Sequence, residues 1–519
     1  MAHFFAASQN TALVTTTKGK IRGYCYDGLS IFKGIPYATA RRFHAPEPLT
    51  PWDGVMDCTS YGYVCPLLQM DAPKGELLVP HRYWPSSENC QNLNVWTPGC
   101  DDQKRPVLFW MHGGGYTAGS SIEQLAYEGE NMAHYGDVVV VSVNHRLNIL
   151  GYLDLSEYGE EYANSANAGS NDLIAALRWV QENIASFGGD PDNVTVMGQS
   201  GGGAKVTTLL QTPAADGLFH KGVNMSGVVG PILADSVGSA KPLVEAMLQE
   251  LKLADVHALE TVPYDRMAEA YNLVSPGLKQ QGQYVGCTPK ANAFYRGTPD
   301  TNGFRTETAG IPLMVGTVFG EFMGFGAPAV DKAAAGEAEQ IAVLQQFMGK
   351  ETCDRMLPMF REAYPERAPI DLVSLDTIFR GPAQQYIRQR AALNSCTYSY
   401  LFNQDFTMDN GHVAWHCADI PYFFHNCELV PVTQEEGVVE NLENAIFSSL
   451  MAFMRTGNPG CEALPDWPAC TPEEEHTMLY AARCTVRTNH DAELIPAMSS
   501  VLIPLMMKFM AQDKDAIRH

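Results

Sequence analysis

The sequence predicts an α/β fold, in which helices cover both faces of a mostly parallel β-sheet. Short apolar runs with the length of buried strands alternate with amphipathic segments of helical length through much of the 519-residue chain. The chain is 45% hydrophobic and 18% charged, a composition typical of a packed globular protein and unlike that of a disordered one. Alternation of strands and helices indicates parallel strands. Such sheets carry their reactive groups in loops at the carboxyl ends of the strands.

Short apolar runs supply the strands of this predicted sheet. They are rich in aliphatic and aromatic side chains, which suits strands that are buried on both faces. Since they recur along the chain with helical segments between them, we expect them to be neighbours in one sheet. In chain order they are residues 107–111, 137–143, 193–197, 222–225, 311–318 and 399–403.

Helices are predicted between several of these strands. The apolar side chains of residues 170–185 fall on one helical face, at Leu173, Leu177, Val180 and Ile184. We expect Ser170 or Asn171 to cap the start of this helix, and the glycines at 188–189 to end it. Residues 202–211 have the pattern of a second helix, which directly follows a strand.

Long segments without strand character interrupt the series twice. Residues 241–304 and 332–383 look mainly helical. We expect them to be inserted cap or lid segments that roof a pocket, because the strand series resumes after each of them. No internal repeat, low-complexity tract or interdomain linker is found in the sequence. Residues 1–519 are therefore predicted to form a single domain.

Charge and cysteine usage exclude several classes of protein. The chain has 35 Lys and Arg against 58 Asp and Glu, a net charge of −23. Such a surface repels phosphates and anionic lipids, so nucleic-acid and membrane partners are disfavoured. No apolar run is long enough to cross a bilayer, and residues 1–10 lack the pattern of a secretory signal. The thirteen cysteines are scattered and odd in number, which predicts reduced thiols. We expect a cytoplasmic monomer or small homo-oligomer.

The strongest local signal is Gly-Gln-Ser-Gly-Gly at residues 198–202. The pattern Gly-x-Ser-x-Gly is short and occurs by chance, but here it lies between a predicted strand and a predicted helix. In that context the glycines permit a tight turn, and Ser200 stands clear of the sheet at a helix N-terminus, which favours developing negative charge. Ser200 is the candidate nucleophile, and an ordinary glycine-rich turn is the alternative.

A second glycine-rich turn, His-Gly-Gly-Gly-Tyr at residues 112–116, directly follows the strand at 107–111. Acyl transfer passes through a tetrahedral oxyanion, which needs two or three backbone N–H groups aimed at one point. Consecutive glycines permit such a backbone and leave no side chain in the way. The alternatives are a flexible loop or a phosphate cradle. A phosphate loop would carry Lys followed by Ser or Thr, which this turn lacks.

A serine nucleophile needs a base, and the base needs a carboxylate that orients it. In folds with this strand–turn–helix nucleophile, the order along the chain is serine, acid, histidine. Glu321 follows the strand at 311–318, where such an acid belongs. Three histidines follow the strand at 399–403, and residue patterns alone do not choose among them: His412, His416 and His425.

Longer segments of the chain resemble the type-B carboxylesterases, the cholinesterase-like family of the α/β-hydrolase fold. The similarity runs nearly from end to end, and its motifs together are highly specific. The matching segments are Gly-Ile-Pro-Tyr-Ala at 34–38, Arg-Phe at 42–43, Ser-Glu-Asn-Cys-Gln-Asn-Leu-Asn-Val-Trp-Thr-Pro at 87–98, Asn-Ala-Gly-Ser-Asn-Asp-Leu at 167–173, Phe-Gly-Gly-Asp-Pro at 187–191, Arg-Thr-Gly-Asn-Pro at 455–459 and Trp-Pro at 467–468.

The resemblance implies a triad in which Ser200 is the nucleophile, His416 the base and Glu321 the acid. It takes His416 from the segment His-Cys-Ala-Asp-Ile-Pro-Tyr at residues 416–422. It also implies that the oxyanion is stabilised by three backbone N–H groups, those of Gly114, Gly115 and Gly201. The family's chemistry needs no cofactor and no metal.

Further positions around the triad follow from the same resemblance. Ser226 is similar to a serine that supports the triad from behind. Cys65 and Cys90 resemble the pair that closes an early loop in secreted members, a bridge that a cytoplasmic chain need not form. Gln199 stands where many members have Glu, and Gly-Glu-Phe at 320–322 replaces the usual Asp-Glu-Gly. The missing carboxylate beside the nucleophile argues against a cationic choline substrate.

A zinc site is the competing interpretation of the region around His416. The residues that could be drawn together are His416, Cys417, His425 and Cys427. However, adjacent His and Cys side chains rarely converge on one ion, and the chain has no Cys-x-x-Cys pair. We therefore expect no metal site here.

The predicted function is that of a serine carboxylesterase, which hydrolyses small-molecule esters to acid and alcohol through an acyl-enzyme. One alternative is a lipase-like hydrolase of the same fold, which would call for a large apolar lid face. The net charge of −23 and the missing secretion signal speak against it. The other alternative is a catalytically inactive, cholinesterase-like binding protein. Such a relative would lack part of the triad, whereas serine, histidine and a carboxylate are all present here.

Overall fold

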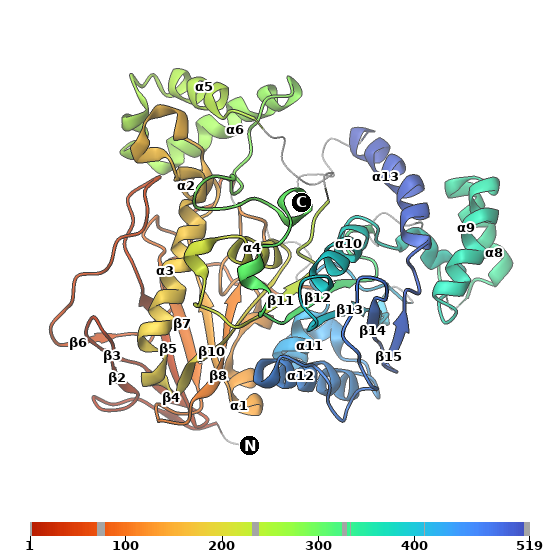
Figure 1. Ribbon diagram of the computed structural model, residues 1–519, viewed down its shortest axis with the longest axis horizontal. Coiled ribbons are helices and arrows are strands. Elements are labelled where there is room, and N and C mark those ends of the chain that lie inside the picture. The colour runs from red at the N-terminus through yellow and green to blue at the C-terminus, as the bar shows by residue number, and fades with distance from the viewer. Residues whose placement is uncertain are drawn as a thin grey trace.

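The central element of the protein is a sheet of twelve strands (Figure 1). The computed structural model describes residues 3–69, 78–230, 238–323, 328, 330–332, 334–408 and 411–512, with side chains as far as residue 504. In the order in which they neighbour one another, the strands are β1 (Phe5–Ala6), β4 (Tyr24–Tyr26), β5 (Leu29–Pro36), β7 (Asn92–Thr97), β9 (Val139–Val143), β8 (Arg105–Met111), β10 (Gly189–Gln199), β11 (Lys221–Met225), β12 (Leu313–Val318), β13 (Thr397–Phe402), β14 (His476–Tyr480) and β15 (Thr485–Thr488).

The middle of this sheet is parallel and its two sides are antiparallel. All neighbouring pairs from β9 to β14 are parallel, while β1, β4, β5, β7 and β15 pair in antiparallel fashion. A second, small sheet lies near the N-terminus and contains β2 (Leu13–Thr15), β3 (Lys20–Arg22) and β6 (Val55–Asp57). Every run that the sequence predicted as a strand overlaps one of the parallel strands, so the prediction of a mostly parallel sheet is confirmed.

Helices cover both faces of the sheet, as predicted. Along β8 the side chains alternate between two buried clusters, with Leu108 and Trp110 in one and Val107 and Phe109 in the other. The first cluster packs against α1, α11 and α12, and the second against α3, α4 and α10. The helices are α1 (Glu130–Gly136), α2 (Asn148–Tyr152), α3 (Ala168–Asn183), α4 (Gly201–Leu210), α5 (Lys241–Leu251), α6 (Tyr264–Gln280), α7 (Pro299–Asn302), α8 (Glu337–Met348), α9 (Lys350–Ala363), α10 (Arg380–Ala391), α11 (Ile420–Phe424), α12 (Val439–Thr456) and α13 (Leu494–Gln512).

The start of α3 differs from the prediction. The helix begins at Ala168, so neither Ser170 nor Asn171 is its cap. A turn of 3-10 helix, Ser165–Asn167, runs directly into α3, and its last bond is donated by the Ala168 N–H to the Ser165 carbonyl. Ser170 and Asn171 therefore lie inside the first turn of the helix, and Asn167, the last residue of the 3-10 turn, precedes it. The end of the helical stretch is as predicted, because Gly188 has φ of 74° and follows a short 3-10 extension.

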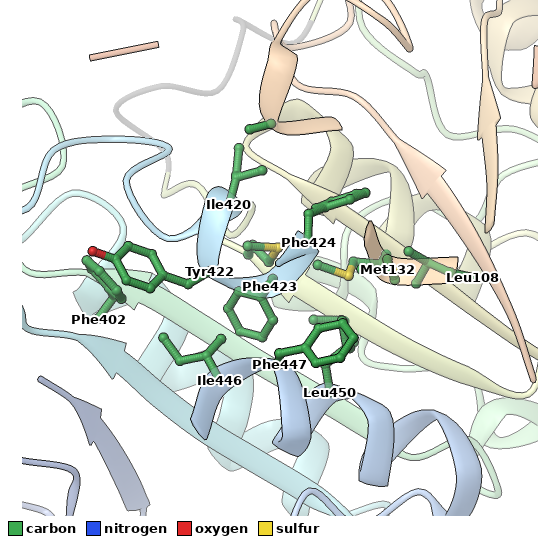
Figure 2. Packing of buried hydrophobic residues seen from close by; sticks show 14 of the residues in the cluster. Leu108, Met132, Phe402, Ile420, Tyr422, Phe423, Phe424, Ile446, Phe447 and Leu450 are labelled. Carbon is green, nitrogen blue, oxygen red and sulfur yellow. The ribbon is translucent and has the colours of Figure 1, made fainter. Parts of the chain in front are cut away.

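A dense aromatic core anchors the chain just after His416. Figure 2 shows the side chains of α11 among Leu108, Met132 and residues of α12. Every residue of α11 is buried. Because α11 begins only four positions after His416, this packing fixes one end of the segment that carries the histidine.

The two predicted insertions are largely helical. Residues 241–304 contain α5, α6 and α7, and residues 332–383 contain α8, α9 and the start of α10. In Figure 1, α5 and α6 lie together at the top, and α8 and α9 lie beside α13 at the right. Each group has its own buried apolar cluster, distinct from the two on the main sheet. That they roof the active site stays a prediction. Within the described residues, no helix combines the length and hydropathy required to span a bilayer.

Candidate active site

Ser200 occupies a strained turn between β10 and α4. Its backbone has φ of 57° and ψ of −123°, a region that residues other than glycine rarely adopt. Its N–H donates to the Met225 carbonyl at 2.8 Å, which ties the turn to the end of β11. Gly202 lets the helix approach β8, since a Cβ built there would lie 2.0 Å from the Met111 carbonyl oxygen. The turn thus holds a partly exposed serine at the carboxyl edge of the sheet.

Glu321 lies just beyond β12 and is completely buried. Its Oε1 accepts hydrogen bonds from Ser226 Oγ at 2.6 Å and from the Val318 N–H at 2.9 Å. Its Oε2 contacts His416 Nδ1, and its carbonyl oxygen accepts from the His416 N–H at 3.1 Å. The Ser226 hydroxyl and the Val318 N–H therefore hold one carboxylate oxygen, while the other oxygen meets the Nδ1 edge of the imidazole. Ser226 directly follows β11.

His416 is the histidine that the fold brings to Glu321. Its Nδ1 faces the carboxylate, and its Nε2 lies 3.2 Å from Gln199 Nε2. The Gln199 amide is oriented by Cys417, whose Sγ donates to Gln199 Oε1 at 3.2 Å. These partners assign an imidazole that donates from Nδ1 and accepts at Nε2. Across the described residues, no hydrogen bond joins Ser200 Oγ to His416, whose Nε2 is occupied by Gln199.

The other two candidate histidines have different partners. His412 Nδ1 lies 2.7 Å from the Val413 carbonyl, and His425 Nδ1 lies 3.2 Å from Glu443 Oε2. His425 also stacks on Tyr135, with ring centroids 4.6 Å apart. Since Cys427 donates its N–H to Glu443 as well, two of the four residues drawn as a zinc site share that carboxylate instead. Where the chain is described, no cluster of three or more metal-ligating side chains is present.

The glycine loop after β8 lies against the N-terminus of α4. Gly114 and Gly115 have φ of 80° and 62°, which glycine adopts without strain. A Cβ built on Gly201 would lie 2.4 Å from the Gly115 nitrogen, so these two backbones are in direct contact. A Cβ built on Gly113 would lie 3.4 Å from Ser200 Cβ. Gly115 and Gly201 therefore lie against each other beside Ser200, and Gly114 precedes Gly115 in the same loop.

Two further buried carboxyl groups lie near Glu321. Burial, together with the negative charge of Glu321, raises the pKa of Asp376 to about 7. Burial likewise raises the pKa of Asp419 to about 7, although a hydrogen bond from Tyr400 OH at 2.8 Å opposes the shift. The Asp376 carboxylate accepts three backbone N–H bonds at the start of α10. Their elevated pKa values limit the negative charge that accumulates around the histidine.

An aromatic wall flanks the imidazole. The Phe322 ring centroid lies 4.3 Å from that of His416, and the Phe379 centroid lies 5.2 Å from it. Phe379 is buried, whereas Phe322 is 52% exposed. The wall gives the site an apolar, uncharged surface next to the triad.

Several of these residues were not found by sequence reasoning. Asp376 and Phe379 carry no local motif and reach the site only through the fold. Lys205 carries a weak sequence signal, since it is the one charged residue in α4, the apolar helix that follows the nucleophile. It was not singled out from the sequence. Cys65 and Cys90, which resemble a disulfide pair, are both buried and both free.

A serine at a strained strand-to-helix turn, a histidine on a buried glutamate and a glycine loop at the carboxyl edge of a parallel sheet define a serine hydrolase of the α/β-hydrolase fold. The comparisons with known proteins narrow this class. The sequence profile described as the Carboxylesterase family matches residues 10–494. The chain belongs to this family, and it is a carboxylic ester hydrolase.

Relatives and solved structures agree with this assignment. The chain is 32% identical to the para-nitrobenzyl esterase of Bacillus subtilis, covering 93% of this chain and 97% of the relative. It is 30% identical to the phenmedipham hydrolase of Pseudarthrobacter oxydans, covering 92% and 97% respectively. A solved esterase from anaerobic Clostridium hathewayi, described as able to hydrolyse aliphatic aromatic polyesters, is 52% identical, with a TM-score of 0.94 over 96% of this chain and 100% of that chain.

Proposed function

We propose that this chain hydrolyses neutral carboxylic esters, with Ser200 as nucleophile, His416 as general base and Glu321 as the carboxylate that orients it. The observation that carries the proposal is the buried contact between His416 Nδ1 and Glu321, next to a serine at the turn between β10 and α4. Ser200 Oγ attacks the ester carbonyl carbon, and its proton passes to His416 Nε2. That proton then goes to the leaving alcohol, and an acyl-enzyme remains.

Water completes the cycle through the same groups. His416 Nε2 takes a proton from the water as its oxygen attacks the acyl carbon, and the proton returns to Ser200 Oγ when the acid leaves. In both halves the carbonyl oxygen becomes an oxyanion, which accepts from the backbone N–H groups of the glycine loop and of α4. These donors are Gly114, Gly115 and Gly201. Ser200 Oγ must replace Gln199 as the partner of His416 Nε2 for the first proton transfer.

The preferred substrates in this proposal are uncharged aryl or alkyl esters. The exposed Phe322 ring beside His416 offers an apolar face, and Gln199 adds no charge next to the nucleophile. Para-nitrobenzyl esters and aliphatic aromatic polyesters, which appear in the descriptions of two similar proteins, belong to this chemical class. A cationic ester would find no carboxylate at position 199 with which to pair.

We also propose that the chain acts in the cytoplasm, as a monomer or small homo-oligomer with reduced thiols. All thirteen cysteines are free, which suits a reducing compartment. Cys65 and Cys90 are the informative pair, because their relatives in secreted members are joined.

The triad is tested by two substitutions and a label. Ser200→Ala and His416→Ala should each lower kcat/KM for a para-nitrophenyl ester by about a thousandfold or more, since the residual rate then comes only from binding and the oxyanion donors. A fluorophosphonate should label wild-type protein on Ser200, which peptide mass spectrometry locates. Circular dichroism and thermal unfolding establish that both variants are folded.

His412→Ala and His425→Ala are the matched controls for the base. Both histidines follow β13 as His416 does, but neither contacts Glu321, so both variants should keep activity near the wild-type level. Loss of turnover in either control with normal turnover in His416→Ala would overturn the assignment of the base. A folded Ser200→Ala protein with wild-type activity would overturn the mechanism.

A further inference from the structure

Lys205 is a buried lysine that the mechanism does not use. It lies on α4, five residues after Ser200, and its exposed fraction is 0%. Its Nζ donates to the His112 carbonyl oxygen at 2.9 Å. Burial lowers the pKa of Lys205 to about 7, against the opposing effect of the Glu123 carboxylate. The amine keeps N–H donors in either protonation state, so the bond to His112 does not depend on its charge.

The acceptor of this bond is the first carbonyl of the glycine loop. The next carbonyl, that of Gly113, lies 2.9 Å from His112 Nδ1, and the carbonyl of Gly114 accepts from the Ala118 N–H at 3.0 Å. Each of these three carbonyls therefore has a hydrogen-bond donor within the protein. A peptide plane that is held at its oxygen also has its N–H direction fixed. The last two of these planes carry the N–H groups of Gly114 and Gly115.

His112 links the lysine to those N–H groups. It is buried, and burial together with the nearby Lys205 lowers its pKa well below the usual value. A neutral ring that donates from Nδ1 can hold the Gly113 carbonyl, and it stacks on the buried His145 with centroids 5.3 Å apart. Lys205 holds the carbonyl group of His112, and the His112 ring in turn holds the carbonyl group of Gly113. A shift of His112 would therefore move the peptide plane that carries the Gly114 N–H.

Packing alone does not account for a lysine at this position. The other side chains of α4 are uncharged, and the helix lies in a closely packed interface between β10 and the glycine loop. Burial of an amine costs free energy that a methionine of similar length would not cost. An apolar residue would remove that cost, but it would leave the buried His112 carbonyl without this donor. What the lysine adds is a donor that joins the helix of the nucleophile to the loop of the oxyanion donors.

We propose that Lys205 is a positioning residue for ester hydrolysis, which holds the glycine loop through the His112 carbonyl so that its N–H groups meet the oxyanion. This inference rests on the proposed roles of Ser200 and of the loop. It goes beyond them, because it assigns a function to a side chain that contacts neither substrate nor triad. The lysine lies on the helix that directly follows the serine, so its hydrogen bond is one of the contacts that hold the nucleophile and the oxyanion donors in register.

The test compares Lys205→Met with Lys205→Gln. In Lys205→Met the donor is lost, and kcat for a para-nitrophenyl ester should fall by roughly 10- to 100-fold with little change in KM, because the loop serves the transition state more than substrate binding. The thermal midpoint of this variant should stay close to that of wild type, because the relief of a buried amine and the loss of a hydrogen bond to a buried carbonyl oppose each other. Lys205→Gln keeps an N–H donor and should recover part of kcat. A residue that served only the fold would lower activity and thermal midpoint together.

Lys221→Met is the matched control. Lys221 is also buried, but it lies at the start of β11 and donates to Asn193, away from the carboxyl edge of the sheet. Its variant should keep wild-type kcat. The proposal fails if Lys205→Met keeps kcat within about twofold of wild type, or if Lys205→Gln is no better than Lys205→Met. Fluorophosphonate labelling distinguishes failure of the proposed triad from failure of the Lys205 inference. An unlabelled Ser200 in wild type contradicts the triad. A labelled Ser200 together with wild-type kinetics in Lys205→Met contradicts only the role of Lys205.

Discussion

Gln199 contacts the ring nitrogen of His416 that takes the serine proton in the proposed mechanism. Its fully buried amide donates from Nε2 to His416 Nε2 at 3.2 Å, and Cys417 Sγ holds the other end of the amide. A glutamate here would set a negative charge against the same ring nitrogen. Opposite charges at such a distance stabilise the protonated imidazole. The glutamine places no such charge beside the general base.

Gln199→Glu should shift the acidic limb of the kcat/KM profile to higher pH. The new carboxylate stabilises the charged imidazole, so His416 gains its proton at a higher pH during acidification and loses the capacity to accept one from Ser200. Activity at pH 6 should fall severalfold relative to wild type, while activity at pH 8 changes less. The measurement is kcat/KM for one neutral ester from pH 5 to pH 9. An acidic limb that stays in place would show that Gln199 does not control the ring.

How far single residues can be predicted depends on whether their partners lie nearby in the sequence. Ser200 and the glycine loop carry local patterns, and the order of serine, acid and histidine points to Glu321. The choice of His416 over its neighbours required the family resemblance, because spacing gives no sign of which ring meets the glutamate. Lys205 depends on an acceptor that lies 93 positions away, so no local pattern shows its role.

At the scale of elements, the site depends on how closely α4 approaches β8. Gly198 and Gly202 face each other across the turn, since a Cβ on Gly198 would lie 2.4 Å from the Gly202 carbonyl carbon. A Cβ on Gly202 would in turn lie 2.9 Å from the His112 carbonyl oxygen, which is the acceptor for Lys205. The same close approach therefore shapes the nucleophile turn and the start of the oxyanion loop.

Gly202→Ala should lower both activity and stability. Its added methyl group would meet the Met111 carbonyl oxygen at 2.0 Å, and backbone atoms cannot give way as the end of a flexible side chain can. Overpacking of this kind costs about 1–3 kcal/mol, and the forced separation of helix and loop should lower kcat by at least about tenfold. Thermal unfolding and ester kinetics measure the two effects.

Gly310→Ala provides the comparison for that substitution. Gly310 is exposed, and a Cβ built there meets no atom within 4 Å, so this variant should match wild type in both assays. Equal behaviour of the two variants would mean that the contact between α4 and β8 relaxes without cost.

Elements differ in how well the sequence predicts them, and burial explains part of the difference. The strands β8, β9 and β12 consist mostly of buried apolar side chains and stand out in the sequence. The N-terminal strands β1, β2, β3 and β4 have two or three residues each and are partly exposed, so they leave no such run. Burial does not explain every case, because β7 is buried throughout but contains two Asn and one Thr, and it was not predicted. Its pairing with β5 and β9 follows from neighbours that a local pattern does not contain.

At the scale of the whole molecule, the net charge of −23 favours the approach of a cationic substrate, whereas the uncharged groups beside Ser200 do not favour its binding. A strongly negative protein attracts cations from a distance and raises the rate of their encounter. Salt limits this attraction, because the field of exposed charges decays over about 8 Å at physiological ionic strength. The groups next to the reacting ester are screened far less. They include the Gln199 amide and the Phe322 ring, neither of which carries a charge.

We therefore expect kcat/KM for a neutral aryl or alkyl ester to exceed that for a choline ester with the same acyl group at physiological salt. The choline ester should respond to ionic strength: its kcat/KM should fall as salt rises from about 10 mM to 150 mM, since the screening length shortens from roughly 30 Å to 8 Å. The neutral ester should be nearly insensitive over the same range, because the long-range field does not act on it. Steady-state kinetics with matched acyl chains at both salt concentrations measure this. A choline preference that persists at 150 mM salt would require a carboxylate or an aromatic cage against the bound cation, and it would contradict a site whose nearest groups to Ser200 are neutral.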